Sequence, residues 1–237
     1  MVRQARPRVV LFDIDNTLTC TDGAGRRALE RAVREITGTV APMPRVAYAG
    51  RTDPSILAEL LAGLGEAAEE ARTGAIMARY VALLEGELAR ARGRVLPGVA
   101  DLLDALEARP HVQLGLLTGN VVEGARLKLG AHGLWHRFGF GAYGPDAPTR
   151  PGLLPVALER ARTLRGELPG FAHTDVYVVG DTVHDVAVAR AHGAVAVAVG
   201  TGAPHQDRGA LLATAPDHFC ETLADAAPLL AALDAGT

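Results

Sequence analysis

A run of four apolar residues, Val9 to Phe12, ends abruptly in two acidic residues, Asp13 and Asp15. Continuous apolar residues are typical of a strand buried on both faces of a parallel sheet. Ligands of open α/β sheets bind beyond the carboxyl ends of the strands, so we expect both carboxylates to face that crevice. Carboxylate oxygens suit Mg²⁺, and a carboxylate can attack phosphorus when cations neutralise the phosphoryl oxygens. The alternative is that both acids are merely surface residues at the end of a strand. The residues that follow the other predicted strands decide between these two explanations.

The rest of the chain predicts a doubly wound sheet with one insertion. Residues 20 to 95 show only helical patterns: one helix ends near Gly38, one begins with Asp53 as N-cap and Pro54 in its first turn, and one or two more span 66 to 92. After residue 95, helical patterns alternate with short apolar runs, as in βαβ units. The strands are expected at 112–117, 138–140, 175–179 and 194–199, and the helices at 99–108, 121–131, 153–164 and 183–192.

Composition excludes several classes of protein. The net charge of -3 shows no basic stripe, which argues against nucleic acid as a partner. No stretch approaches eighteen uninterrupted apolar residues, so no membrane span is expected. The two cysteines, Cys20 and Cys220, suggest no disulfide framework, and the N-terminal apolar run is too short for a signal peptide. We therefore expect a cytoplasmic protein; monomer and homodimer both stay open.

Two further strand ends carry matching chemistry. The strand at 112–117 is followed by Thr118, Gly119 and Asn120, where a hydroxyl and helix N-terminal N–H groups would form a phosphate cradle. Helix capping by Thr118 or Asn120 is the simpler alternative. The strand at 175–179 leads to Asp181 and Asp185, which would complete an acidic metal site with Asp13. A capping box from Thr182 explains Asp185 without chemistry, but it leaves Asp181 unexplained.

Four carboxylates and a phosphate would repel one another, so a fixed cation is needed in addition to Mg²⁺. Arg150, directly before Pro151 and the helix at 153–164, is the best placed basic residue in the interval after the third predicted strand. A solvated loop arginine is the alternative. Lys128, the only lysine of the chain, would have to point off a helix two turns beyond Thr118, and we do not expect it in the site.

Taken together, Asp13-Ile14-Asp15-Asn16-Thr17, Thr118, Arg150 and Gly180-Asp181 with Asp185 resemble, in order, the four motifs of the haloacid dehalogenase (HAD) superfamily. The resemblance covers essentially the whole chain. It implies an α/β fold: a Rossmann-like parallel sheet core, residues 1–19 and 96–237, with an inserted all-helical cap of the C1 type, residues 20–95. Asn16 stands where glycine is commoner, and it adopts the left-handed backbone region readily.

The resemblance also implies roles for the site residues. Asp13 would be the nucleophile, and Asp15 would protonate the leaving oxygen and then deprotonate water. Thr118, with Gly119 and Asn120, would bind the phosphoryl group, and Arg150 would replace the family's usual lysine. Mg²⁺ would be held by Asp13, the Asp15 carbonyl and Asp181, with Asp185 acting through water.

The reaction that the resemblance implies is hydrolysis of a small phosphate monoester. Dehalogenases of the superfamily lack an acid at the position of Asp15, and phosphonate cleavage uses a cap lysine, which residues 20–95 do not contain. Phosphoryl transfer as in β-phosphoglucomutase-like members is the alternative, followed by a domain that binds a phosphorylated ligand or a partner protein without catalysis.

The substrate is expected to be a small phosphorylated compound, like phosphoglycolate or a sugar phosphate. In helical-cap relatives, the loop between the first two cap helices contacts the substrate; here it carries Gly50, Arg51 and Thr52. Arg51 would pair with a second anionic group of the substrate. Alternatively, Thr52 only caps a helix and Arg51 is solvated.

Overall fold

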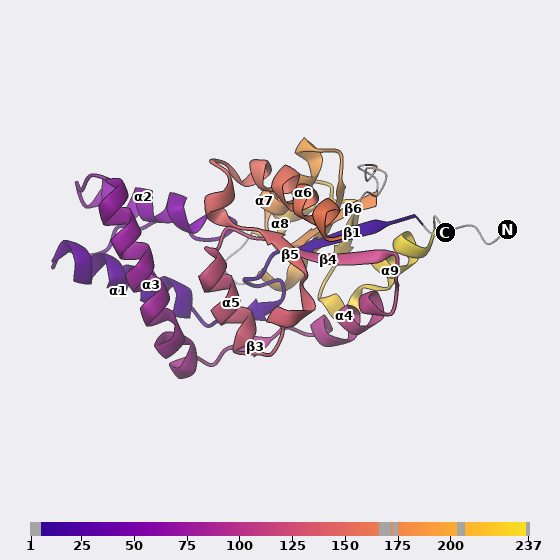
Figure 1. The fold of residues 1–237 in the computed structure, drawn as a ribbon, viewed down its shortest axis with the longest axis horizontal. Helices are drawn as coiled ribbons and strands as arrows, with labels where there is room; N and C mark the ends of the chain where they lie inside the picture. The colour runs from indigo at the N-terminus through magenta and orange to yellow at the C-terminus, as the bar shows by residue number, and fades with distance from the viewer. Residues whose placement is uncertain (1–5, 166–171, 173–174, 203–206, 236–237) are drawn as a thin grey trace.

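A six-stranded parallel sheet forms the centre of the protein in the computed structural model, which describes residues 6–165, 172, 175–202 and 207–235. The strand order is β5-β4-β1-β6-β7-β8, so the chain winds outward in both directions from β1 (Figure 1). The strands are β1 (Arg8–Phe12), β4 (Val112–Leu117), β5 (Phe140–Ala142), β6 (Val176–Gly180), β7 (Val195–Val199) and β8 (His218–Cys220).

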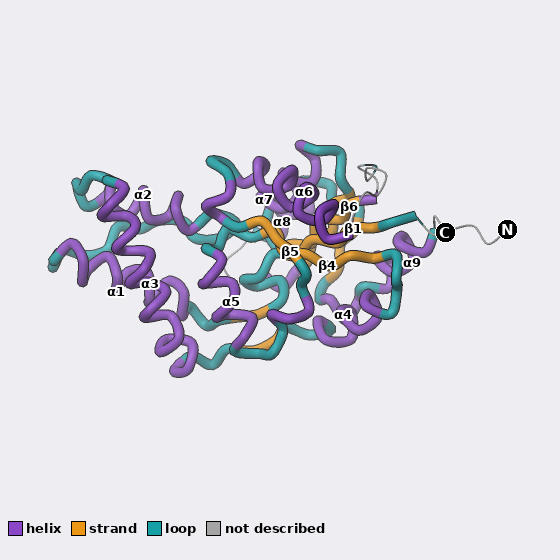
Figure 2. Tube along the Cα trace, viewed as in Figure 1, coloured by secondary structure: helices purple, strands orange, loops and turns teal. Residues whose placement is uncertain are grey.

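Helices cover both faces of this sheet, as the alternation of helix and strand requires (Figure 2). On one face pack α4 (Val99–Glu107), α5 (Val122–Gly130) and α9 (Ala227–Asp234). On the other face pack α6 (Leu153–Arg165), α7 (Val183–Ala191) and α8 (Arg208–Ala213). Successive residues of β1 alternate between the two cores: Val10 and Phe12 face one, Val9 and Leu11 the other. Both faces of β1 are buried, which is why Val9 to Phe12 are all apolar.

The insertion after β1 consists of α1 (Ala24–Thr37), α2 (Asp53–Gly63) and α3 (Glu70–Arg90), which share a separate apolar core. Figure 1 shows these helices at the end of the molecule away from α4 and α9. A small antiparallel ribbon, β2 (Thr19–Cys20) with β3 (Arg94–Val95), joins the two points where the chain enters and leaves the insertion. Val121 and Leu127 pack against the helices of the insertion, so its core reaches the region of α5.

The observed elements confirm the predicted fold class, and the strand at 112–117 has the predicted bounds. The strand expected at 138–140 lies two residues later, at Phe140–Ala142. Periodicity missed the ribbon, because two-residue strands carry no repeat, and it missed α8, β8 and α9. Within the described residues, no helix has the length and apolar content needed to cross a bilayer.

Candidate active site

The carboxyl ends of β4, β1 and β6 lie side by side, because these strands are neighbours in the sheet. This adjacency brings together three of the predicted motifs, which are separated by as many as 168 positions in the sequence. They line a cavity of about 770 Å³ between the sheet and the inserted helices. The predicted site residues in its wall are Asp13, Asp15, Thr118, Gly119, Asn120, Arg150, Asp181, Gly50 and Arg51.

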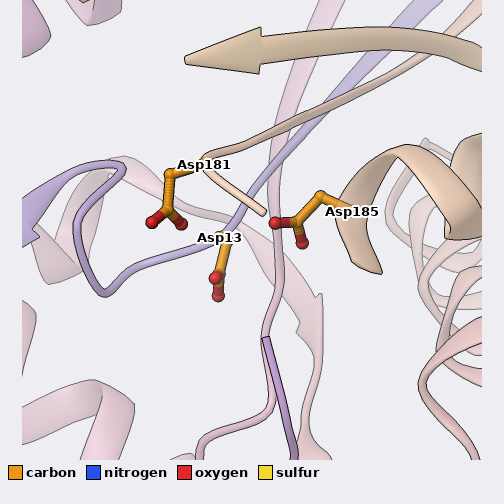
Figure 3. Close-up of side chains that lie close together, drawn as sticks. All are labelled: Asp13, Asp181 and Asp185. Carbon is orange, nitrogen blue, oxygen red and sulfur yellow. The ribbon is translucent and has the colours of Figure 1, made fainter. Parts of the chain in front are cut away.

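Asp13, Asp181, Asp185 and Arg150 form a buried group of charges, which we call the arginine cluster. One carboxylate oxygen from each aspartate lies within 4.8 Å of the others. Figure 3 shows the three side chains gathered where β1 and β6 end and α7 begins. The Arg150 guanidinium contacts Asp13 Oδ2 at 3.0 Å and also pairs with Asp185. Arg150 is only 8% exposed, so the solvated loop arginine is excluded.

Asp185 is held on both of its oxygens. Oδ1 accepts from Arg150, and Oδ2 accepts from the backbone N and the hydroxyl of Thr182 at 3.0 and 2.7 Å. Thr182 in turn accepts from the Asp185 backbone N, which completes a capping box at the start of α7. The capping explanation of Asp185 is therefore correct, and it coexists with a place in the acidic cluster. Asp185 does not line the cavity, so it contacts the other members of the cluster from the side away from the cavity.

Burial and mutual repulsion disfavour charge on two of these aspartates. Desolvation raises the pKa of Asp13 to about 6, although Arg150 opposes this shift. Burial, followed by the charges of Asp185 and Asp13, raises the pKa of Asp181 well above its usual value. One arginine does not balance three carboxylates. A set of buried carboxylate oxygens with excess negative charge fits a hard divalent cation such as Mg²⁺.

The turn after β1 brings Thr17 beneath this cluster. Asn16 has a φ of 59°, the left-handed conformation expected for this position. The fully buried Thr17 hydroxyl donates to Asp181 Oδ1 at 3.3 Å. The turn therefore links the end of β1 to the acid that follows β6.

Thr118 is fully buried directly after β4, where its backbone N donates to the Ala142 carbonyl. Its hydroxyl accepts from the Asn120 side-chain amide at 2.8 Å and from the Asn120 backbone N at 3.4 Å. The N-cap of α5 is Val121, so neither Thr118 nor Asn120 occupies the capping position. Both polar side chains instead lie in the cavity wall beside Asp15.

Lys128 lies in the site, contrary to the expectation from sequence. Its ammonium group donates to Asp15 Oδ2 and to Asn120 Oδ1, both at 2.6 Å, and the residue is 5% exposed. We call Asp15, Asn120 and Lys128 the lysine cluster. The buried residues of α5 are Gly124, Ala125, Lys128 and Leu129, which share one helix face. A single lysine within an apolar stripe was the signal that could have revealed it.

The lysine cluster favours the charged form of its carboxylate. Burial alone would raise the pKa of Asp15, but the charge and hydrogen bond of Lys128 and the Asn120 amide lower it below the usual value. Burial would likewise depress the pKa of Lys128, and the charges of Asp15 and Asp53 raise it instead. Asp15 and Lys128 therefore form an ion pair at neutral pH.

The segment Gly50 to Asp53 closes against the strand ends. The Asp53 backbone N donates to the Gly119 carbonyl at 2.7 Å, and the Val121 backbone N donates to Asp53 Oδ2 at 2.8 Å. A Cβ on Gly119 would lie 2.0 Å from the Arg51 carbonyl oxygen, so only glycine allows this approach. The helix cap of α2 is Thr52, not the predicted Asp53, and Thr52 accepts from Ser55. Arg51 lines the cavity and pairs with Glu59.

A family model for haloacid dehalogenase-like hydrolases matches residues 7–193, which include every motif of the site. The chain belongs to the haloacid dehalogenase-like hydrolases. It is 29% identical over 219 residues to a probable phosphatase, IndB, of Dickeya dadantii, covering 92% of this chain and 90% of that protein. A phosphoglycolate phosphatase of Synechococcus elongatus is 33% identical over 132 residues, 56% of this chain and 57% of that protein.

Among solved structures, a hydrolase from Pseudomonas syringae superposes with a TM-score of 0.71 at 19% identity, covering 94% of this chain and 97% of that one. At this identity the likeness concerns the fold, and it confirms the predicted HAD-like α/β architecture. The protein is therefore an enzyme of the HAD hydrolase family, as the four motifs predicted, and the two relatives are named as phosphatases.

Proposed function

We propose that this HAD hydrolase is a Mg²⁺-dependent phosphatase that cleaves a small phosphate monoester through an aspartyl-phosphate on Asp13. The observation that carries the proposal is the arginine cluster, of which Asp13, Asp181 and Arg150 line the cavity. It combines a buried carboxylate, an excess of acidic oxygens and a fixed guanidinium within one group of side chains. The phosphatase names of two relatives support the same reaction.

In the proposed reaction each group has a task. Asp13 Oδ attacks phosphorus, while the leaving oxygen takes a proton from Asp15; Asp15 then removes a proton from the water that releases phosphate. Arg150 and the hydroxyl of Thr118 offset charge on the phosphoryl oxygens. Asp13, the carbonyl of Asp15 and Asp181 would hold Mg²⁺, with Asp185 supporting them, and the bound cation would neutralise phosphoryl charge.

The cavity supports a small phosphorylated compound as the substrate. Its volume of about 770 Å³ lies in the range of sites for ligands larger than a two-carbon acid, so phosphorylated sugars belong in the candidate set beside phosphoglycolate. Arg51 in the wall would attract a second anionic group. Gly50 and Thr52 would set the position of Arg51, since they flank it where the segment meets the strand ends.

The test is phosphate release from phosphoglycolate, sugar phosphates and sugar bisphosphates, with Mg²⁺ or with EDTA. Asp13→Asn is expected to lower the rate by at least about 1,000-fold, because it removes the nucleophile. The matched control is Asp101→Asn, which changes an exposed carboxylate on α4 and is expected to leave the rate unchanged. Release that survives both Asp13→Asn and EDTA would contradict the proposal.

Two other outcomes would replace the proposed phosphatase function with a different one. An isomeric phosphate in place of free phosphate, with a requirement for a bisphosphate activator, would indicate a mutase. Tight binding of a phosphorylated compound without any turnover would indicate a non-catalytic domain.

A further inference from the structure

We propose that Lys128 is the positioning residue that holds the Asp15 carboxylate for proton transfer to and from the reacting oxygens. This inference rests on the phosphatase reaction proposed above and adds a residue to it. It starts from one observation: the only lysine of the chain is buried and divides its ammonium group between Asp15 and Asn120 at 2.6 Å each.

The contacts fix the Asp15 carboxylate through one of its oxygens, and the Thr21 side chain is a further hydrogen-bond partner of the same carboxylate. Oδ2 of Asp15 accepts from the Lys128 ammonium at 2.6 Å and from the Asn120 amide at 2.9 Å. Two donors on one oxygen define the rotation of the carboxylate about its Cβ–Cγ bond. The proton that passes between Asp15 and the reacting oxygens is then exchanged at a carboxylate of fixed orientation.

Asn120 orients the pair through both ends of its amide. Its oxygen accepts from Lys128, and its nitrogen donates to Asp15 and to the Thr118 hydroxyl at 2.8 Å. The lysine cluster is thereby tied to the residue assigned to the phosphoryl group. This connection places the proton donor at a fixed position relative to phosphorus, which a side chain moving freely in solvent would not have.

The inserted helices contribute a second contact to the Lys128 ammonium group, and we call the contact between Lys128 and Gly25 the clamp. Gly25, in the first turn of α1, faces the ammonium group, and a Cβ there would lie 3.2 Å from Lys128 Nζ and 3.3 Å from its Cε. The absence of a side chain at this position leaves the space that the ammonium group needs. The clamp therefore combines a lysine from α5 with a glycine from α1.

The first experiment compares leaving groups in Lys128→Met, which keeps the length of the side chain and removes its charge. An alkyl phosphate with an uncharged alkyl group, glycerol 2-phosphate, needs a proton on its leaving oxygen, whereas p-nitrophenyl phosphate, whose leaving group is stable as an anion, does not. We expect kcat/KM to fall on the order of 100-fold for the alkyl ester and less than about fivefold for the aryl ester. Arg126→Met, which removes an exposed cation from the same helix, is the control and is expected to change neither value.

Equal losses for both esters, or no loss for either, would overturn the proposal. So would a loss confined to substrates with a second anionic group, because Lys128 would then bind the substrate directly. Wild-type protein that releases no phosphate from any ester would refute the proposed function together with this role.

Gly25→Ala tests the clamp without removing the lysine, and alanine favours helix over glycine. The added methyl group is expected to displace the ammonium group and to reproduce the leaving-group selectivity in part. Gly86→Ala in α3, where a Cβ meets nothing within 4 Å, is the matched control. Identical behaviour of the two variants would contradict the clamp.

A readout that does not need turnover uses the single lysine. Protein labelled with ¹³Cε-lysine gives one resonance, which Asp15→Asn is expected to shift while Asp101→Asn leaves it in place. A signal at the position of free lysine that ignores Asp15→Asn would refute the contact and with it the proposed role, whatever the enzyme's activity.

Discussion

The arginine cluster and the lysine cluster lie at the same end of the sheet, yet their charges are balanced differently. Three carboxylates share one guanidinium in the arginine cluster, whereas one carboxylate meets one ammonium group in the lysine cluster. The pKa values follow this difference: burial raises that of Asp13 to about 6, and Lys128 holds that of Asp15 below its usual value despite burial. The excess negative charge of the arginine cluster suits a bound cation. The balanced charges of the lysine cluster instead hold the Asp15 carboxylate in one orientation.

The largest effect should come from the cation of the arginine cluster. Arg150→Met is expected to lower kcat/KM for phosphate release on the order of 1,000-fold, because the phosphoryl oxygens lose a fixed donor and two acids lose their partner. Arg150→Lys keeps the charge and is expected to retain activity within about tenfold. If Met and Lys at this position give equal rates, the charge of Arg150 has no part in the reaction.

Arg150 and Lys128 also differ in how far the sequence revealed them. Arg150 could be predicted because motif order fixes its place after the third predicted strand. The apolar stripe of α5 signals that Lys128 is buried, but it does not tell which carboxylate Lys128 contacts, because that depends on the rotation of α5 about its own axis and on how α1 packs there. The ends of the strands can be predicted from apolar runs, because the chain direction alone decides at which edge of a parallel sheet each strand ends. The contacts of a helix face can be predicted only when the neighbouring element that covers it is known.

The same limit explains the other differences. Val112–Leu117 has apolar residues or glycine at every position except Gln113, has clear ends, and was predicted with its observed bounds. The ribbon of Thr19–Cys20 and Arg94–Val95 arises only because two distant crossings of the chain meet. Asp53 looked like a helix cap from its place before Pro54, but its carboxylate accepts from Val121, a partner 68 positions away.

Asp53 beside the lysine cluster provides the next test. Burial raises its pKa to about 6, with Lys128 opposing the shift. A raised pKa means that the folded state holds this proton more tightly than the unfolded state, so the stability is present below pH 4 and is lost as pH rises through 6. Asp53→Asn cannot titrate and keeps an oxygen for Val121. Relative to wild type, the variant is expected to gain up to about 3 kcal/mol in the free energy of unfolding between pH 4 and pH 7.

Urea unfolding in EDTA at several pH values measures this gain, and the difference from wild type cancels the titration of all other groups. A difference that does not change with pH would show that Asp53 is charged in both states. Lys128 would then stabilise the charged form of Asp53 as it stabilises that of Asp15.

Mg²⁺ should distinguish the two clusters directly. At free Mg²⁺ one hundred times its dissociation constant, the free energy of unfolding is expected to rise by about 2.7 kcal/mol, because the ion binds the folded state. Asp181→Asn is expected to abolish this increment. Asp15→Asn is expected to preserve it, because in the proposed site Asp15 would offer only its backbone carbonyl to the ion. Thermal unfolding with Mg²⁺ and with EDTA gives each increment, and a loss in Asp15→Asn alone would reverse the assignment of the two clusters.

The smallest effect concerns the support behind the arginine cluster. Thr182→Ala removes the hydroxyl that accepts from the backbone of His184 and Asp185 and donates to Asp185 Oδ2. The cost is expected to be about 1 kcal/mol in the free energy of unfolding, as for other helix caps. Thr182→Ser keeps the hydroxyl and should lose less than half of that. If Thr182→Ala instead costs activity in proportion to Arg150→Met at unchanged stability, the capping box is part of the catalytic geometry and Asp185 does more than hold Arg150.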